Sequence, residues 1–150
     1  MSALPGSGKS TWAKKYAEIH RNTYVLSSDE VRFEVTKSYQ DFSKQKKVWR
    51  LIHKRIKKLA KANDITLIVD ALNDTNLIRL DYVKKYPKFD KYVLVFMNKD
   101  KTELEYFNHQ RPRQKWVPEE ALKRLYERFE NISDEVRRAY NEVIEINDYS

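Results

Sequence analysis

Residues 3–11 read Ala-Leu-Pro-Gly-Ser-Gly-Lys-Ser-Thr, so two glycines, a lysine and several hydroxyl groups lie within one short segment. Gly6 and Gly8 can adopt the positive φ angles that turn successive backbone N–H groups inward. Such N–H groups and the N-terminus of a following helix form a concave anion site. Lys9 and Ser10 complete the pattern G-x-x-x-x-G-K-[S/T], in which the lysine reaches the β- and γ-phosphates and the hydroxyl binds Mg²⁺. The segment therefore predicts a loop that binds ATP and Mg²⁺.

The predicted nucleotide-binding residues of this loop are Gly6, Ser7, Gly8, Lys9, Ser10 and Thr11. Ala3 stands where the first glycine of the pattern usually lies, so the strict pattern is broken by one methyl group. The alternative is a Gly/Ser turn that merely precedes a lysine. The correct spacing of Lys9 and Ser10 and the helix-compatible residues 11–17 favour the phosphate-binding loop.

Asp29 and Arg32 follow a predicted strand at residues 24–27. They are one helical turn apart, so both side chains are expected on the same side of a helix that starts at residues 28–29. In an open parallel sheet, ligands bind beyond the carboxyl ends of the strands. A carboxylate there can accept a proton, although Asp29 could instead cap the helix, and Arg32 could be an ordinary surface arginine.

Asp70 ends the apolar run at residues 66–70, which is typical of a central parallel strand. A carboxylate at this position could bind Mg²⁺ through water. Asp74 is the rival, and the sequence does not decide between them. A third interpretation is that Asp70 only caps the next turn.

Strands and helices must alternate to position these groups, and the sequence predicts such an order. A long basic helix is predicted to end near Ala62, with Asp41 or Ser43 as its cap. Another helix is predicted to begin with a capping box formed by Thr102 and Glu105. The remaining predicted elements are helices at 77–86, from Pro118 onward and at 134–140, and strands at 91–96 and 142–146. This order predicts an α/β fold with a central parallel sheet between two helical layers, a three-layer fold.

Composition limits the function classes. The 150 residues, without repeats or linkers, predict one domain spanning 1–150. The absence of cysteine excludes disulfides, zinc–thiolate sites and thiol nucleophiles. No apolar run is long enough for a membrane span and no apolar signal segment begins the sequence, so a cytoplasmic protein without a membrane partner is expected.

The formal net charge of +8 favours polyanionic partners. Much of the excess lies between Lys44 and Lys61, where Phe42, Trp49, Ile52, Ile56 and Leu59 form an apolar helical stripe and the lysines cover other faces. A solvated helix face explains such a charge run by itself. Beside a phosphate-binding loop, a nucleic acid is the alternative, and its binding would depend on salt.

Several motifs together resemble the phage-type polynucleotide 5′-hydroxyl kinases and their relatives among the small P-loop kinases. They are the segment Pro5–Ala13, the Asp29-x-x-Arg32 pair and the Asn108-x-x-Arg111 element followed by Val117-Pro118. The resemblance covers essentially the whole chain after its first strand. It implies a P-loop kinase fold with a basic lid at about 108–117, and it suggests a phage or prophage origin.

The resemblance also implies roles for single residues. Asp29 matches the general base that orients and deprotonates the acceptor hydroxyl, and Arg32 matches the arginine that binds the phosphate next to it. Arg111 matches the lid arginine that stabilises the transferring phosphoryl group. With Lys9, these residues form the predicted catalytic set.

The lid departs from the family at one position. The family often carries another arginine four residues before Arg111, where this chain has Phe107. Arg113 or Lys115 could replace it, and Arg113 is predicted to contact the nucleotide. The predicted metal ligands are Ser10 and Asp70.

The sequence therefore predicts Mg²⁺-dependent transfer of the ATP γ-phosphate to the 5′-hydroxyl of RNA or DNA ends, with any ligase or phosphatase supplied by separate proteins. Two alternatives stay open: a kinase of a small hydroxylated metabolite or nucleotide, and a nucleotide-binding module without phosphotransfer. Because so little precedes the phosphate loop, the first strand is expected to be truncated, or Met1 to be an internal methionine of a longer chain.

Overall fold

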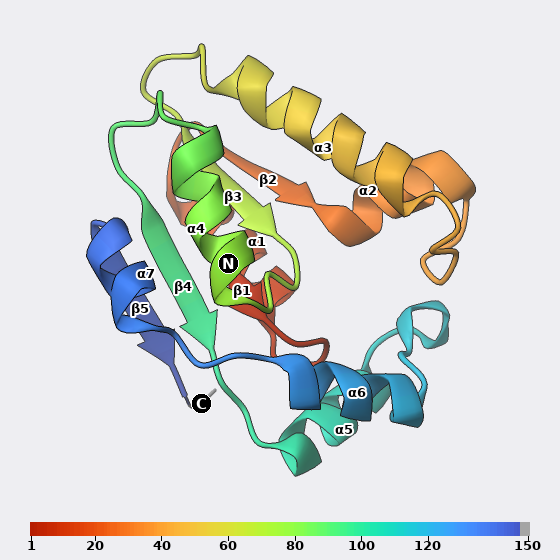
Figure 1. The fold of residues 1–150 in the computed structure, drawn as a ribbon. Helices are drawn as coiled ribbons and strands as arrows, with labels where there is room; N and C mark the ends of the chain where they lie inside the picture. Colours follow the sequence, from red (N-terminus) through yellow and green to blue (C-terminus); the bar gives the residue numbers. More distant parts are fainter. Residues whose placement is uncertain (148–150) are drawn as a thin grey trace.

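The computed structural model describes residues 1–147, in which parallel strands alternate with helices (Figure 1). The strands are β1 (Ser2–Ala3), β2 (Thr23–Ser27), β3 (Thr66–Asp70), β4 (Val93–Met97) and β5 (Glu142–Ile146). The helices are α1 (Lys9–Ile19), α2 (Ser28–Thr36), α3 (Gln45–Leu59), α4 (Asn76–Lys85), α5 (Lys101–Gln110), α6 (Glu119–Arg128) and α7 (Asp134–Ala139), with a 3₁₀ turn η1 (Arg113–Lys115).

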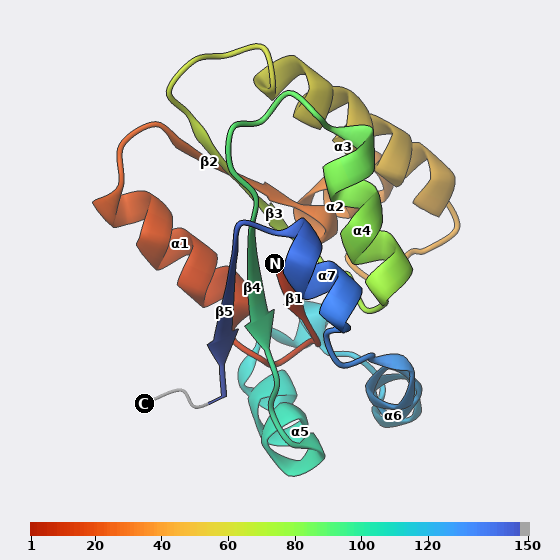
Figure 2. The same ribbon diagram turned by 60° about the vertical axis from the view of Figure 1, so that its left-hand side comes forward.

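All strand pairs are parallel: β2 with β3, β1 with β4, and β4 with β5. The two groups of strands meet at β1, because the Met1 nitrogen donates to Val69 O at 2.9 Å and Ala3 N donates to Leu72 O at 3.1 Å. The order across the molecule is therefore β2-β3-β1-β4-β5. Figure 2 shows α1 on one face and α3, α4 and α7 on the other, which confirms the predicted three-layer α/β fold.

The strands are built as their sequences predict. The last four residues of β4 (Leu-Val-Phe-Met) are all buried, as expected for a strand covered on both faces. The edge strands β2 and β5 contain more exposed residues. Helices α5 and α6 lie beyond the carboxyl ends of the strands, where the phosphate loop also begins (Figure 2).

The first strand is as short as predicted, with two buried residues. Asn73 supplements its backbone pairing, because its Nδ2 donates to Met1 O at 2.5 Å while its own carbonyl accepts from Ser2 Oγ at 2.7 Å. Asn73 has a left-handed φ of 45°, which asparagine tolerates. The loop after β3 therefore anchors the strand that leads into the phosphate loop.

Two predictions about α3 were wrong. The helix ends at Leu59 rather than near Ala62, and neither Asp41 nor Ser43 caps it. Its N-cap is Lys44, which makes no side-chain cap bond, while Asp41 Oδ1 accepts from Ser43 N within the preceding loop. The short polar side chain of Asp41 stabilises a turn instead of the helix end.

The apolar side of α3 also differs from the predicted stripe. Val48, Ile52 and Ile56 are the buried residues of the helix. Phe42 is 58% exposed and lies before the helix, which starts at Gln45. Trp49 is 37% exposed at the edge of the apolar side, and the neighbouring Val48 faces the core instead.

The cap of α5 was also predicted wrongly. Asp100 Oδ1 accepts from Glu103 N at 2.8 Å, so Asp100 is the N-cap instead of Thr102. Two candidate caps lie two residues apart, and where the chain leaves β4 decides which of them is used.

Candidate active site

The phosphate loop connects β1 to α1. Gly6 and Gly8 have φ angles of 83° and 90°, as the motif predicts, and Gly8 is the N-cap of α1 without a side-chain bond. The backbone therefore turns at both glycines and the positive end of the helix dipole faces the loop. This arrangement is suited to binding a phosphate chain.

Gly6 also lies against α5. A Cβ atom built at Gly6 would lie 2.6 Å from Leu104 O and 3.0 Å from Asn108 N. No side chain fits there, so Gly6 is required by both its φ angle and its surroundings. The contact places α5, which carries Arg111 at its end, directly beside the phosphate loop.

Ser10 and Asp70 meet on the opposite side of the loop. Ser10 Oγ donates to Asp70 Oδ2 at 2.7 Å, and Asp70 is 3% exposed. Asp70 Oδ1 is buried without a hydrogen-bond partner. A hydroxyl and an orphaned carboxylate oxygen fit Mg²⁺, which binds through one or two protein oxygens, waters and phosphates. Within residues 1–147 there is no group of three or more histidine, cysteine, aspartate or glutamate side chains that could hold a metal ion.

The rival carboxylate is engaged elsewhere. Asp74 is 3% exposed, and its Oδ2 lies 3.3 Å from Arg128 Nη2 as an ion pair without a hydrogen bond. Of the two aspartates, the structure brings Asp70 to Ser10.

Asp29 lies between two arginines. Arg32 Nη1 donates to Asp29 Oδ1 at 2.7 Å, and Arg111 Nη2 lies 3.5 Å from Asp29 Oδ2. Ser27 rather than Asp29 caps α2, because Ser27 Oγ accepts from Glu30 N. The capping alternative for Asp29 is therefore wrong, and its carboxylate points to the arginines.

The charges around Asp29 decide its protonation. Burial acts to raise the pKa of Asp29, but the positive charges of Lys9, Arg32 and Arg111 outweigh burial and hold its pKa below the ordinary value. The carboxylate is therefore ionised at neutral pH. The influence of Lys9 places the lysine of the phosphate loop in the same electrostatic environment as Asp29.

Arg32 is held within the chain, and its alternative as an ordinary surface arginine is wrong. It is 5% exposed, and its Nε donates to Gln45 Oε1 at 3.1 Å, while its guanidinium lies 4.1 Å from the ring of Phe42. It therefore fixes the orientation of Asp29. A contact of Arg32 with an acceptor phosphate stays a prediction.

The predicted lid leaves α5 at Arg111 and returns at Val117. Asn108, which is 1% exposed, closes this loop: its Oδ1 accepts from Val117 N and its Nδ2 donates to Val117 O. The indole Nε1 of Trp116 donates to Arg111 O at 2.8 Å. Arg111 is thereby held at the base of the lid, with its Nη1 buried and without a hydrogen-bond partner.

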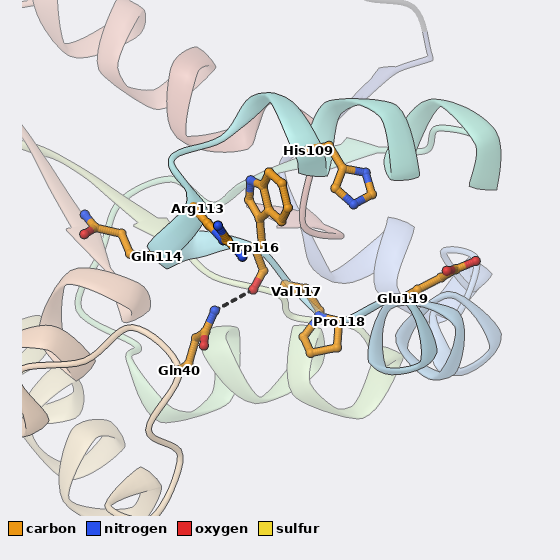
Figure 3. Close-up of a pocket in the computed structure, with 8 residues that line it drawn as sticks. All are labelled: Gln40, His109, Arg113, Gln114, Trp116, Val117, Pro118 and Glu119. Carbon is orange, nitrogen blue, oxygen red and sulfur yellow. Dashed lines mark hydrogen bonds between the residues drawn. The ribbon is translucent and has the colours of Figure 1, made fainter.

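The lid contacts the α2 side of the site. Gln40 Nε2 donates to Trp116 O at 2.8 Å, and Lys115 Nζ lies 3.2 Å from Glu30 Oε1. A cavity of about 510 Å³ lies at this junction, and Figure 3 shows the residues that line it. Its lining residues are Gln40, His109, Arg113, Gln114, Trp116, Val117, Pro118 and Glu119.

The candidates for the missing lid arginine lie apart from Phe107. Arg113 has its guanidinium 5.9 Å from the ring of Trp116, and Lys115 pairs with Glu30. The ring of Phe107 is instead contacted by Lys99, whose Nζ lies 4.3 Å from its centroid. A nucleotide contact by Arg113 remains a prediction.

Sequence reasoning missed the residues that join the lid to α2 and α3. Glu30, Gln40 and Gln45 carry no motif, and their partners lie 85, 76 and 13 residues away in the chain. The position of Glu30 next to Asp29 was the one available signal.

The described residues contain no helix that combines the length and the apolar character needed to cross a bilayer. Residues 2–132 match the family described as AAA domain, AAA_33. Among solved structures, the chain is similar to a gluconokinase from Sinorhizobium meliloti 1021, with a TM-score of 0.64 and 18% identity over 97% of this chain and 79% of that one. At this identity the likeness shows the fold alone, which is that of a P-loop kinase. The chain therefore belongs to the AAA domain family AAA_33.

Proposed function

We infer that the protein transfers the γ-phosphoryl group of ATP to a hydroxyl group. The observation that carries this proposal is the ionised Asp29 carboxylate, placed among Lys9, Arg32 and Arg111 beside a phosphate loop. Phosphoryl transfer needs little more from a protein than positioning and charge stabilisation.

Each residue has a distinct task in this proposal. Asp29 accepts a hydrogen bond from the acceptor hydroxyl and takes its proton as the oxygen bonds to the γ-phosphorus. The bond between the γ-phosphorus and the β–γ bridging oxygen breaks, and ADP leaves. Arg111 exchanges its long contact with Asp29 for the transferring phosphoryl group, which also satisfies its orphaned Nη1.

Ser10 and Asp70 would hold Mg²⁺, directly and through water. When bound, the ion neutralises charge on the β- and γ-phosphates. Lys9 and the backbone of the loop at Gly6, Ser7, Gly8 and Thr11 would hold the phosphate chain of ATP.

The first candidate acceptor is a small hydroxylated molecule. The similar solved structure is named a gluconokinase, and the family match fits small P-loop kinases in general.

The second candidate is the 5′-hydroxyl of an RNA or DNA end. The spacing of Asp29 and Arg32 resembles that of polynucleotide kinases, and the net charge of +8 favours a polyanion. A third, non-catalytic outcome is a nucleotide-binding module, in line with the departures at Ala3 and Phe107.

One assay separates these outcomes. The protein is incubated with γ-labelled ATP and Mg²⁺, with either 5′-hydroxyl oligonucleotides or a panel of small hydroxylated compounds, and Lys9→Ala and Asp29→Ala serve as inactive variants. Glu34→Gln is the matched control, because it removes an exposed carboxylate on the same helix that pairs with Arg55 and not with the lid. We expect transfer that is lost in both inactive variants and retained in Glu34→Gln. No label on any acceptor would reject a kinase, and full transfer by Asp29→Ala would reject the proposed base.

A further inference from the structure

The net positive charge of the protein is concentrated on one segment. Residues 44–61 contain nine of the 30 lysines and arginines and none of the 22 aspartates and glutamates. The rest of the chain therefore has 21 basic and 22 acidic residues and is close to neutral. If the excess of positive charge were spread over the whole chain, it would not indicate a particular binding surface. Its concentration in residues 44–61 does indicate one.

The basic residues of this segment share one side of α3. At 100° per residue, six of them fall within an arc of about 120°, opposite the buried side formed by Val48, Ile52 and Ile56. The six are Lys46, Lys47, Arg50, Lys54, Lys57 and Lys58, and all are exposed. We call them the α3 basic face. Figure 1 shows α3 along the rim of the molecule, with its outer side away from the strands.

Helix stability does not explain this face. The first turn of α3 has no acidic residue and no side-chain cap, and Lys46 and Lys47 lie where the positive end of the helix dipole disfavours cations. In the part of the chain that the structure describes, Arg55 pairs with Glu34, but no ion pair is formed by the six residues of the face. The face therefore gathers like charges at an energetic cost that a polyanionic partner would relieve.

We propose that the α3 basic face binds the phosphate backbone of a nucleic acid. From Lys46 to Lys58 the helix rises about 18 Å, roughly the length of five successive phosphates of one strand in a duplex. Trp49, which is 37% exposed on the flank of the face, and Phe42, which is 58% exposed before the helix, offer rings on which bases can stack.

A lipid surface fits this helix less well. A basic amphipathic helix binds membranes by burying its apolar side in the bilayer. Here that side is already part of the protein core, where Val48, Ile52 and Ile56 pack with Leu26 and Val31. An acidic polypeptide would match the charge but would not use the exposed rings.

The N-terminal end of α3 lies near the candidate active site, because Gln45, its first residue, accepts from Arg32, which in turn binds Asp29. The binding face itself does not depend on the proposed phosphotransfer.

The test is equilibrium binding of fluorescent single-stranded oligonucleotides across a salt series. The triple variant Lys54→Gln, Lys57→Gln, Lys58→Gln is compared with a matched control, Lys15→Gln, Lys88→Gln, Lys123→Gln, which removes the same charge from exposed positions elsewhere. We expect wild type and control to bind alike, and the α3 variant to bind at least about 10-fold more weakly, with a salt slope shallower by about 2.

Three further measurements test the charge of the lysines, the folding of the variants and the binding of other polyanions. Replacement of the same three lysines by arginine should retain binding, and thermal melting should show that all variants fold. Equal binding by the α3 variant and the control would overturn the proposal, as would a salt-independent affinity. The same comparison is made with vesicles that contain phosphatidylserine and with polyglutamate of equal charge. If either binds α3 as tightly as the oligonucleotide does, the proposal is overturned in favour of that partner. Because binding is measured without ATP, failure here leaves the kinase proposal untouched, and an inactive kinase leaves this one untouched.

Discussion

Arg79 and Arg111 are both arginines next to the first strand and its loop, but their surroundings differ. Arg79 is 0% exposed, and all three of its guanidinium nitrogens donate hydrogen bonds. Arg111 is 22% exposed, has one ion-pair contact at 3.5 Å and leaves a buried Nη1 without a hydrogen-bond partner.

Saturation of the donors distinguishes the two. Arg79 ties together Ser2, the loop after β3 and the segment at residues 130–131, and its guanidinium also lies 5.4 Å and 5.3 Å from the rings of Phe96 and Phe129. Nothing is left over for a ligand. Since buried polar groups are normally satisfied, the orphaned donor of Arg111 indicates a site that a ligand completes. Arg79 thus supports the fold, whereas the partly exposed Arg111 keeps a donor that a ligand at the candidate site could use.

The largest expected effect concerns Arg111. Arg111→Ala should lower kcat for the proposed phosphotransfer by about 10³-fold or more, because a lid arginine stabilises the charge of the transferring group. Its thermal stability should remain close to that of wild type. Gln110→Ala, an exposed neighbour on the same helix, is the control. A full-rate Arg111→Ala enzyme would remove the contrast with Arg79.

Arg79→Leu should have the opposite signature. It removes the hydrogen bonds that the guanidinium donates to the carbonyls of Asn73, Asp74 and Glu130, and the first two keep only Ser2 Oγ and Glu130 N as donors. The free energy of unfolding should therefore fall by about 3–5 kcal/mol. Urea denaturation measures this, with Arg124→Leu on the exposed side of α6 as the control. Equal stability of the two variants would contradict a structural role for Arg79.

A smaller effect is expected at Ser7 and Ser10. Ser7 Oγ is buried without a hydrogen-bond partner, so Ser7→Ala should leave the free energy of unfolding without ATP unchanged or raise it by up to about 1 kcal/mol. Ser10→Ala deprives the buried Asp70 carboxylate of its donor and should cost about 1–3 kcal/mol. The comparison fails if Ser7→Ala is the more damaging change in chemical denaturation.

The smallest expected effect is a shift in titration. The pKa of Asp29 lies below its ordinary value, so its ionised form contributes stability above the unfolded-state pKa, and this stability is lost as the pH falls through the folded-state pKa. Arg111→Gln removes one of the charges that lower it, so the pKa should rise toward the unfolded-state value and the stability that ionised Asp29 contributes should become smaller. Carboxyl ¹³C NMR of Asp29 measures the shift, and an unchanged or lower pKa in Arg111→Gln would contradict the arrangement.

Much of the fold follows from local sequence patterns. The apolar run of β3 and the alternation of elements predicted the parallel sheet, and β5 was predicted with its observed bounds. The phosphate loop was equally readable, because its glycine angles, lysine and hydroxyl are set by residues next to one another. Helix ends were less predictable: adjacent polar residues, such as Asp100 and Thr102, are chemically equivalent as caps.

Other features were decided only by tertiary structure. The sequence predicted Asp70 as a metal ligand with Asp74 as its rival, and the fold turns Asp74 toward Arg128, 54 positions away, and Asp70 toward Ser10. It likewise brought Arg111 to Asp29 and gave Arg79 its partners. The sequence by itself determines which groups can do chemistry and on which local elements they lie, because turns and helix or strand periodicity depend on neighbouring residues. The pairing of those groups depends on contacts between distant segments, which no local pattern encodes.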